Sequence, residues 1–219
     1  MLNDIFTSST GFIIFASIGL SAGLIGALVA ALAYRGKEGE RYSPLNHFIS
    51  ELGEVGVSRL AWAFNLGLII TGLCLIPATI SLGLMIGSVL SKIALVVGVV
   101  SAISLGLVGV FPMNRDKTHG FVAVTYFRTG LVMVILFSLA IGFQQGETLA
   151  LSRWYALAGA PPILAFGFFL WLFGKTYKKS KEPLATQDVQ RPKIWTLAVL
   201  EWLIFVSMIV WFLVIAWGL

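Results

Sequence analysis

The chain has 219 residues, of which 58% are hydrophobic and only 11% are charged, and its mean hydropathy is +0.93. Soluble domains carry about 25% charged residues, so this chain has too little charge to cover a water-facing surface, which excludes a soluble globular fold. In such a chain the net charge of +5 indicates membrane topology, and we expect no nucleic-acid partner.

Runs of about 20 apolar residues recur, each long enough to cross a bilayer core of about 30 Å. We therefore predict an all-α fold, a bundle of six transmembrane helices that forms a single domain over residues 1–219. The spans are predicted at about 11–34, 60–85, 89–111, 121–143, 155–174 and 195–217. We expect the first span to be retained, because residues 1–10 contain no Lys or Arg for the basic start of a signal peptide.

Small residues at four-residue spacing mark the first span, and this pattern is typical of close helix–helix packing. They are Gly19, Gly23, Gly26, Ala27, Ala30 and Ala31. The single cysteine, Cys74, lies in an apolar run, where a buried thiol is expected and an intramolecular disulfide is excluded. Pro77 predicts a kink in the second span, and Pro161-Pro162 predicts a kink or break in the fifth.

The polar connection after the first span carries a helix start signal, with Ser43 as N-cap and Pro44 at the first helical position. The residues that follow separate into two faces. Leu45, Phe48, Ile49 and Leu52 lie on one, and His47, Ser50, Glu51 and Glu54 lie on the other. We expect a short amphipathic helix at the membrane surface, ended by Gly53, with its polar face in water.

The distribution of Lys and Arg predicts the orientation. The connections between spans 1–2, 3–4 and 5–6 hold four, two and six of them, whereas the other two connections hold one or two in total. Because positive residues stay in the cytoplasm, we expect a multi-pass protein of the cell membrane with these three connections cytoplasmic and both termini outside.

Three polar residues lie inside predicted spans at similar depth: Asn65, Arg128 and Glu201. Each is roughly 9–12 Å from the same side of the membrane, at about 1.5 Å per residue. An ionised side chain in lipid costs about 2.5 kcal/mol or more unless it is paired or hydrated. We therefore expect an Arg128–Glu201 pair that faces the bundle interior.

Two interpretations of this pair stay open. It is either a buried ion pair that locks two helices together, with Asn65 as interhelical glue, or the floor of a polar pocket that opens at one leaflet. In the pocket, Arg128 would bind a lipid headgroup or similar anion and Glu201 would orient it. The rim of the pocket would come from His47, Ser50, Glu51, Asp116 and His119.

Other chemistry at this rim is less favoured. His47, Glu51, Asp116 and His119 are possible nitrogen and oxygen ligands for a metal, but no HExxH motif is present and both histidines are as well explained as interfacial residues. Neither histidine lies in a span, which disfavours haem, and no GxSxG motif surrounds Ser50 as a nucleophile. We predict no cofactor.

Two stretches resemble a known family. Asn46-His-Phe-Ile-Ser-Glu-Leu-Gly53 with Phe64-Asn65, and Gly109-Val-Phe-Pro112 followed by Asp116 and His119, are similar to stretches of small six-span membrane proteins related to the damage-regulated autophagy modulator (DRAM) and Frag/Sfk-type proteins. The resemblance implies a six-helix bundle and a role in membrane lipid organisation. It also implies that one patch holds Ser50, Glu51, Asn65, Pro112, Asp116 and His119.

The function expected from the sequence is therefore the binding of a lipid headgroup or similar amphiphile, with membrane lipids as partners. A membrane-embedded lipid hydrolase or transferase that uses His and carboxylate groups, with or without a metal, is one alternative. A structural subunit of a larger membrane complex is another, with a membrane-protein partner or a second copy of the chain. Transport ranks below these, because the sequence shows no inverted repeat.

Overall fold

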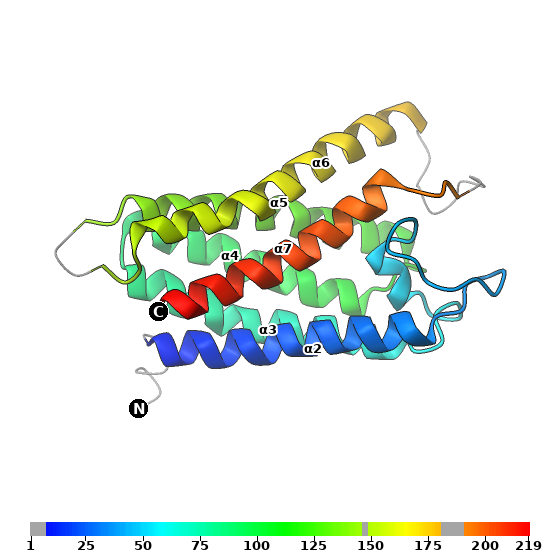
Figure 1. The fold of residues 1–219 in the computed structure, drawn as a ribbon, viewed down its shortest axis with the longest axis horizontal. Helices are drawn as coiled ribbons and strands as arrows, with labels where there is room; N and C mark the ends of the chain where they lie inside the picture. The colour runs from blue at the N-terminus through cyan, green and yellow to red at the C-terminus, as the bar shows by residue number, and fades with distance from the viewer. Residues whose placement is uncertain (1–7, 146–148, 181–190) are drawn as a thin grey trace.

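The computed structural model describes residues 8–145, 149–180 and 191–219 (Figure 1). Six helices in this part of the chain are long and apolar enough to cross a membrane. They are α2 (Ser9–Ala33), α3 (Ala61–Ile86), α4 (Val89–Val110), α5 (Asp116–Gly142), α6 (Ala160–Ser180) and α7 (Thr196–Gly218). Two short 3-10 helices, η1 (Ile49–Gly53) and η2 (Arg153–Gly159), accompany them, and no strand occurs among the described residues. The all-α, six-span prediction is confirmed.

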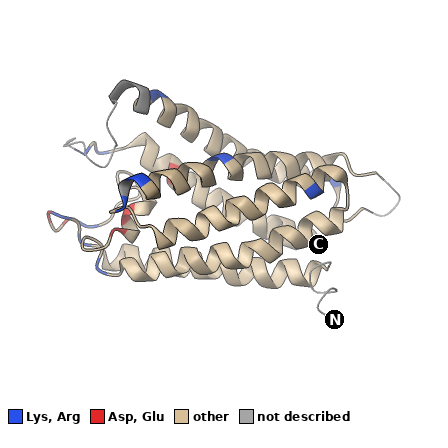
Figure 2. Cartoon of the chain, turned by 180° about the vertical axis from the view of Figure 1, so that it is seen from behind, with Lys and Arg blue, Asp and Glu red and all other residues tan. Residues whose placement is uncertain are grey.

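The helices run alternately up and down the bundle (Figure 1). Each packs against the next along the chain, and α7 also packs against α2, which closes the bundle. The N and C markers lie at one end of the bundle, and residues 34–60, 111–115 and 191–195 lie at the other. We call this second end the polar end, because most of the charged residues in the described part of the chain lie there (Figure 2).

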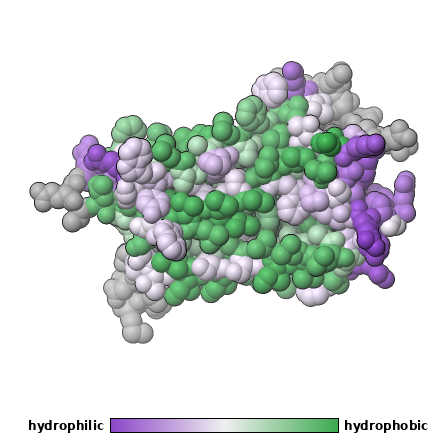
Figure 3. Space-filling model, in the orientation of Figure 1, coloured by the Kyte–Doolittle hydropathy of each residue, from purple (hydrophilic) through white to green (hydrophobic). Residues whose placement is uncertain are grey.

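The side surface of the bundle is a broad hydrophobic band, and the most hydrophilic surface lies at the polar end (Figure 3). Large apolar side chains such as Leu32, Leu73 and Val89 are exposed along this band. An apolar surface of this extent is stable only against lipid or protein. Together with the six long apolar helices, this makes the chain a multi-pass membrane protein.

The small residues of α2 face α3, as the sequence predicts. A Cβ atom added to Gly26 would lie 2.6 Å from the carbonyl oxygen of Ala63, and one added to Gly67 would lie 2.7 Å from that of Ala22. The two backbones therefore touch here, and only a residue without a Cβ fits. Thr71 strengthens the same contact, because its hydroxyl donates a 2.8 Å hydrogen bond to the carbonyl of Gly19.

The two prolines that were expected to kink or break the fifth span lie at the start of its helix, where they leave the helical hydrogen bonds intact. Pro161 and Pro162 occupy the first turn of α6, directly after the 3-10 helix η2. The first backbone N–H groups of a helix have no partner within it, so proline removes no hydrogen bond at this place. Pro77 lies inside α3, as expected.

The short helix after the first span is present, but it is shorter than predicted. Ser43 starts only a turn, in which its carbonyl accepts the N–H groups of Asn46 and His47. The backbone is extended at Phe48, and helical structure is limited to the five residues Ile49–Gly53. The expected wet face is also wrong, because His47 and Glu51 are buried and face other parts of the protein.

Candidate functional site

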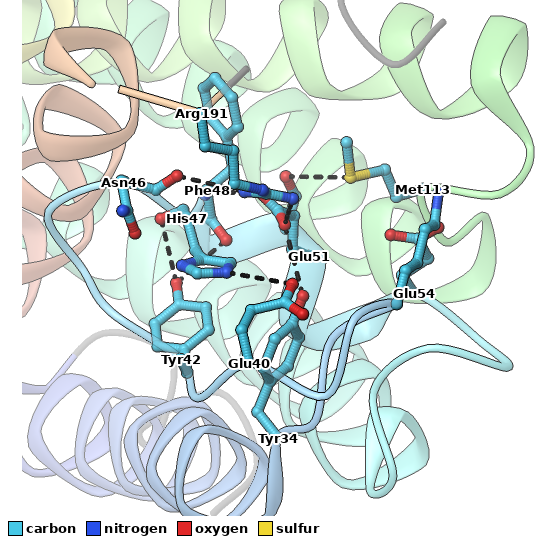
Figure 4. Close-up of polar contacts among 12 residues, drawn as sticks. Tyr34, Glu40, Tyr42, Asn46, His47, Phe48, Glu51, Glu54, Met113 and Arg191 are labelled. Atoms are coloured by element: carbon cyan, nitrogen blue, oxygen red, sulfur yellow. Dashed lines mark hydrogen bonds and ion pairs between the residues drawn. The ribbon is translucent and has the colours of Figure 1, made fainter. Parts of the chain in front are cut away.

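Glu51 is the centre of a group of buried polar side chains at the polar end (Figure 4). Its carboxylate accepts the N–H of Phe48 at 2.9 Å and the hydroxyl of Tyr34 at 3.4 Å. It also accepts both terminal nitrogens of Arg191, at 3.0 and 2.7 Å. This bidentate pair is the strongest type of ionic hydrogen bond available to a carboxylate. We call Tyr34, Glu40, Tyr42, His47, Glu51 and Arg191 the Glu51 cluster.

His47 lies in the Glu51 cluster between two tyrosines. Its ring centroid is 5.4 Å from that of Tyr34 and 5.2 Å from that of Tyr42. The Nδ1 atom lies 3.3 Å from the backbone N of Ser43, and Nε2 lies 3.7 Å from a carboxylate oxygen of Glu40. Burial would raise the pKa of Glu40, but hydrogen bonds from backbone N–H groups, together with the proximity of His47, outweigh this effect and lower the pKa.

Tyr42 connects this cluster to α7. Its hydroxyl donates to the backbone carbonyl of Phe48 at 3.0 Å and accepts the indole N–H of Trp202 at 2.7 Å. Burial raises the pKa of Tyr42, and burial followed by the charge of Glu51 raises the pKa of Tyr34. Hydrogen bonds to Glu51 raise the pKa of Arg191. Through Tyr34 and Tyr42, the cluster binds η1 to both α2 and α7.

Glu201 of α7 also binds η1. It is a buried residue of α7, and its Oε2 accepts the backbone N–H of Ile49 at 2.8 Å. The N–H and hydroxyl of Ser50 also interact with this carboxylate. Glu201 therefore satisfies the free backbone donors at the start of η1, as an acidic residue does at a helix N-terminus.

The predicted Arg128–Glu201 pair is wrong. Arg128 is exposed on the outer surface of α5, and no described acidic residue lies within 4.0 Å of it. The two side chains point in different directions, outward from α5 and inward from α7. A pocket floored by both residues is therefore absent from the described structure.

Asn65, predicted in the floor, and the remaining rim residues make separate contacts. Asn65 donates to the carbonyl of Gly53 at 3.0 Å, and Ser50 contacts the sulfur of Met113 at 3.9 Å. His119 lies in the first turn of α5, with its Nδ1 2.8 Å from the carbonyl oxygen of Phe111 at the end of α4. Asp116 begins α5, but its side chain lies outside the described residues. No three described His, Cys, Asp or Glu residues are grouped to hold a metal.

A different feature of the polar end is open to a ligand. A groove of about 680 Å³ runs over the start of α3 and the end of α4. Arg59 and Arg115 line its polar part, whereas Trp62, Leu66 and Ile69 line its apolar part. We call it the interfacial groove.

One wall of the interfacial groove is held by a side-chain amide. Asn114 accepts the backbone N–H of Val55 at 3.0 Å and donates to the carbonyl of the same residue. A Cβ added to Gly109 would collide with the carbonyl oxygen of Asn65, so α3 and α4 touch at the floor. These contacts connect the segment around Val55 to Asn114, and α3 to α4, on the two sides of the groove.

The two arginines of the interfacial groove have no counter-charge within the described chain. Arg59 and Arg115 are exposed, and neither forms an ion pair with a described residue. Arg115 only overlies the ring of Phe111, at 5.9 Å. The hydroxyl of Ser58 is buried in the wall and has no hydrogen-bond partner there. The site thus offers positive charge to a ligand.

A family comparison agrees with this architecture. A family described as "Protein of unknown function (DUF998)" matches residues 17–218, which is nearly the whole chain. The chain belongs to the DUF998 family. No curated protein and no solved structure shows significant similarity to this DUF998 protein. The family match does not extend to the DRAM and Frag/Sfk-type proteins, so that resemblance stays a prediction.

The sequence did not predict several residues that the structure of this DUF998 protein places in the Glu51 cluster or in the interfacial groove. Arg191, Tyr34 and Tyr42 were not expected at the Glu51 cluster, and Arg59 was treated only as a topology signal. A usable signal existed for the groove, because Arg59 and Trp62 directly precede and follow the start of an apolar run. A cation beside an interfacial tryptophan is typical of a membrane boundary. No local signal pairs Arg191 with Glu51.

Proposed function

We propose that this DUF998 protein binds the headgroup of a membrane lipid in the interfacial groove. The observation that carries the proposal is the continuity of two unpaired arginines with an apolar wall on the outer surface of the bundle. A lipid needs both features at once, because its headgroup is charged and its chains stay in hydrocarbon. Arg59 and Arg115 replace Arg128 as the expected headgroup ligands.

The dimensions of the interfacial groove support an amphiphile rather than a small ion. Ile69 lies eight residues after Ala61, the first residue of α3, which is about 12 Å along the helix axis at about 1.5 Å per residue. The apolar part therefore extends from the membrane boundary into the hydrocarbon layer. Trp62 is exposed beside it, with an amphipathic ring suited to the level of the headgroups.

The polar end belongs in the cytoplasm of a cell-membrane protein under this proposal, because it carries most of the Lys and Arg residues. The groove would then face the inner leaflet, where anionic lipids attract basic residues. A hydrolase or transferase has less support, since His47 and His119 lie in separate surroundings. The proposal requires no partner protein and no second copy of the chain.

Native mass spectrometry of the full chain, released from its membrane in mild detergent, tests the proposal. We expect a retained lipid on the unmodified protein, and Arg59→Gln and Arg115→Gln should each lower the retained fraction at least fivefold. Arg41→Gln is the matched control, because Arg41 is exposed in the connection that also carries Arg59 but does not line the groove. Equal loss in all three variants, or no retained lipid on any of them, would overturn the proposal.

A further inference from the structure

The lining of the interfacial groove also restricts the class of headgroup. None of the described residues that line it is Asp or Glu. An ammonium group, such as that of a choline or ethanolamine headgroup, would find no carboxylate there and would lie beside Arg59 and Arg115. Like charges at close range repel, and specificity often depends on such an unfavourable contact. The groove therefore disfavours zwitterionic lipids.

The two arginines of the groove also indicate how much negative charge the ligand carries. Two guanidinium groups, each with five N–H donors in a planar fork, face one groove without a described counter-charge. A phosphodiester headgroup offers one negative charge and two unesterified oxygens. A phosphomonoester carries about −1.5 to −2 charges at neutral pH and presents three strong acceptor oxygens. The monoester therefore matches the two arginines better than the diester does, both in charge and in the number of acceptor oxygens.

Ser58 belongs to the wall of the same groove, but its hydroxyl is not a donor for a ligand. The residue is 5% exposed, and the hydroxyl oxygen is buried in the wall without a hydrogen-bond partner. The polar contacts available to a ligand therefore come from the two exposed arginines. The clamp between Asn114 and Val55 holds this wall in position before a ligand binds.

We infer that the interfacial groove selects an amphiphile that ends in a phosphomonoester, such as phosphatidic acid or a long-chain prenyl phosphate. The phosphate lies between Arg59 and Arg115, and the hydrocarbon chain lies along Leu66 and Ile69. This inference rests on the proposed function, since it names the ligand class of the same groove.

Competition between lipids on the full chain in detergent tests the inference. Equimolar phosphatidic acid, phosphatidylglycerol and phosphatidylcholine, with the same acyl chains, are presented together, and bound lipid is counted by native mass spectrometry. We expect phosphatidic acid to exceed phosphatidylglycerol at least tenfold at pH 7.5. Because the second ionisation of a phosphomonoester has a pKa of about 6, this preference should shrink several-fold at pH 5.5, whereas phosphatidylglycerol binding stays unchanged.

Variants locate the selectivity in the groove. Arg59→Gln and Arg115→Gln should each reduce the ratio of phosphatidic acid to phosphatidylglycerol by at least fivefold. Arg41→Gln should leave the ratio unchanged. Glycerol 3-phosphate is the soluble competitor in this test. It should compete only at concentrations at least a hundredfold above those of phosphatidic acid, because it makes no contact with the apolar wall.

Each outcome separates the inference from the proposal beneath it. Equal binding of phosphatidic acid and phosphatidylglycerol, both sensitive to Arg59→Gln, overturns the phosphomonoester inference and leaves lipid binding supported. Absence of binding by all three lipids overturns both. If glycerol 3-phosphate competes at the same concentration as phosphatidic acid, the ligand is a soluble phosphate ester and the lipid-binding proposal is overturned.

Discussion

Glu51 accepts hydrogen bonds from both terminal nitrogens of Arg191, at 3.0 and 2.7 Å, although 140 residues separate the two in the sequence. The pair joins the connection after α2 to the segment that leads into α7. The side chain of Glu51 is 3% exposed and that of Arg191 is 38% exposed, so the carboxylate is desolvated while the guanidinium keeps contact with water. Removing Arg191 therefore leaves a buried charge without its partner.

The first prediction concerns this pair. Arg191→Gln and Glu51→Gln should each lower the free energy of unfolding by about 1–3 kcal/mol, the usual range for a hydrogen bond to a charged group. The full cost of breaking a buried ion pair is larger, but the exposure of Arg191 reduces it here. Unfolding of the purified chain in mixed micelles, followed by circular dichroism, measures both variants.

The double variant provides the control for this pair. If the two side chains stabilise each other, the combined loss should be about 1–2 kcal/mol smaller than the sum of the single losses. Arg41→Gln, in the same connection, should leave the free energy of unfolding unchanged. Strict additivity would show that the two residues act separately.

A second prediction follows from the outward position of Arg128. Arg128→Leu should leave the free energy of unfolding unchanged or raise it, because an apolar side chain suits the lipid-facing surface of α5 better than a charge does. Glu201→Gln should lower it by about 1–3 kcal/mol, since the buried amide has donors without acceptors beside Ile49. The effects of the two substitutions should add within about 0.5 kcal/mol. A larger coupling energy would indicate a direct interaction between Arg128 and Glu201.

A third prediction concerns alkaline pH and Tyr42. Burial raises the pKa of Tyr42 above its ordinary value of 10.0, so the phenol is neutral in the folded chain at a pH where it ionises in the unfolded chain. Its contribution to stability is therefore complete below pH 10 and is lost as the pH rises above that value. Tyr42→Phe removes this ionisation, and the fall in stability between pH 10 and 11.5 should become shallower by about 1.4 kcal/mol per pH unit.

Tyr42→Phe has a separate effect at neutral pH. The indole N–H of Trp202 loses its acceptor and the carbonyl of Phe48 loses its donor, so stability at pH 7 should fall by about 1–3 kcal/mol. Denaturation curves collected at several pH values distinguish the two effects. An unchanged slope above pH 10 would mean that Tyr42 ionises as readily in the folded chain as in the unfolded one.

The fourth prediction tests the contact between α2 and α3. Gly67→Ala should lower the free energy of unfolding by about 1–3 kcal/mol, because its Cβ would lie 2.7 Å from the carbonyl oxygen of Ala22 and force the helices apart. Gly167→Ala is the matched control inside α6, where nothing lies within 4 Å of an added Cβ. It should be neutral or slightly stabilising, since alanine favours the helix. Similar losses in both variants would refute the close contact.

Much of the fold was predictable because the signals that encode it are local. The length of each apolar run determines whether it crosses a membrane, and six such runs became six helices. The small residues of the first span predicted a close contact, because the absence of a Cβ has the same meaning in any fold, and Gly26 indeed lies against Ala63. The short helix was less predictable, since the carboxylates of Glu51 and Glu201 bind the N–H groups of Phe48 and Ile49 and replace the expected cap at Ser43.

The sequence by itself determined that this is a six-span membrane protein with its charge gathered at one end, because hydrophobicity and charge act residue by residue. Only the tertiary structure decided which charges meet. Depth along a helix can be counted from the sequence, but the direction in which a side chain points depends on how its helix is rotated against its neighbours. For that reason Arg128 and Glu201, which the sequence predicts at a similar depth, do not meet, whereas Glu51 and Arg191 meet from distant parts of the chain.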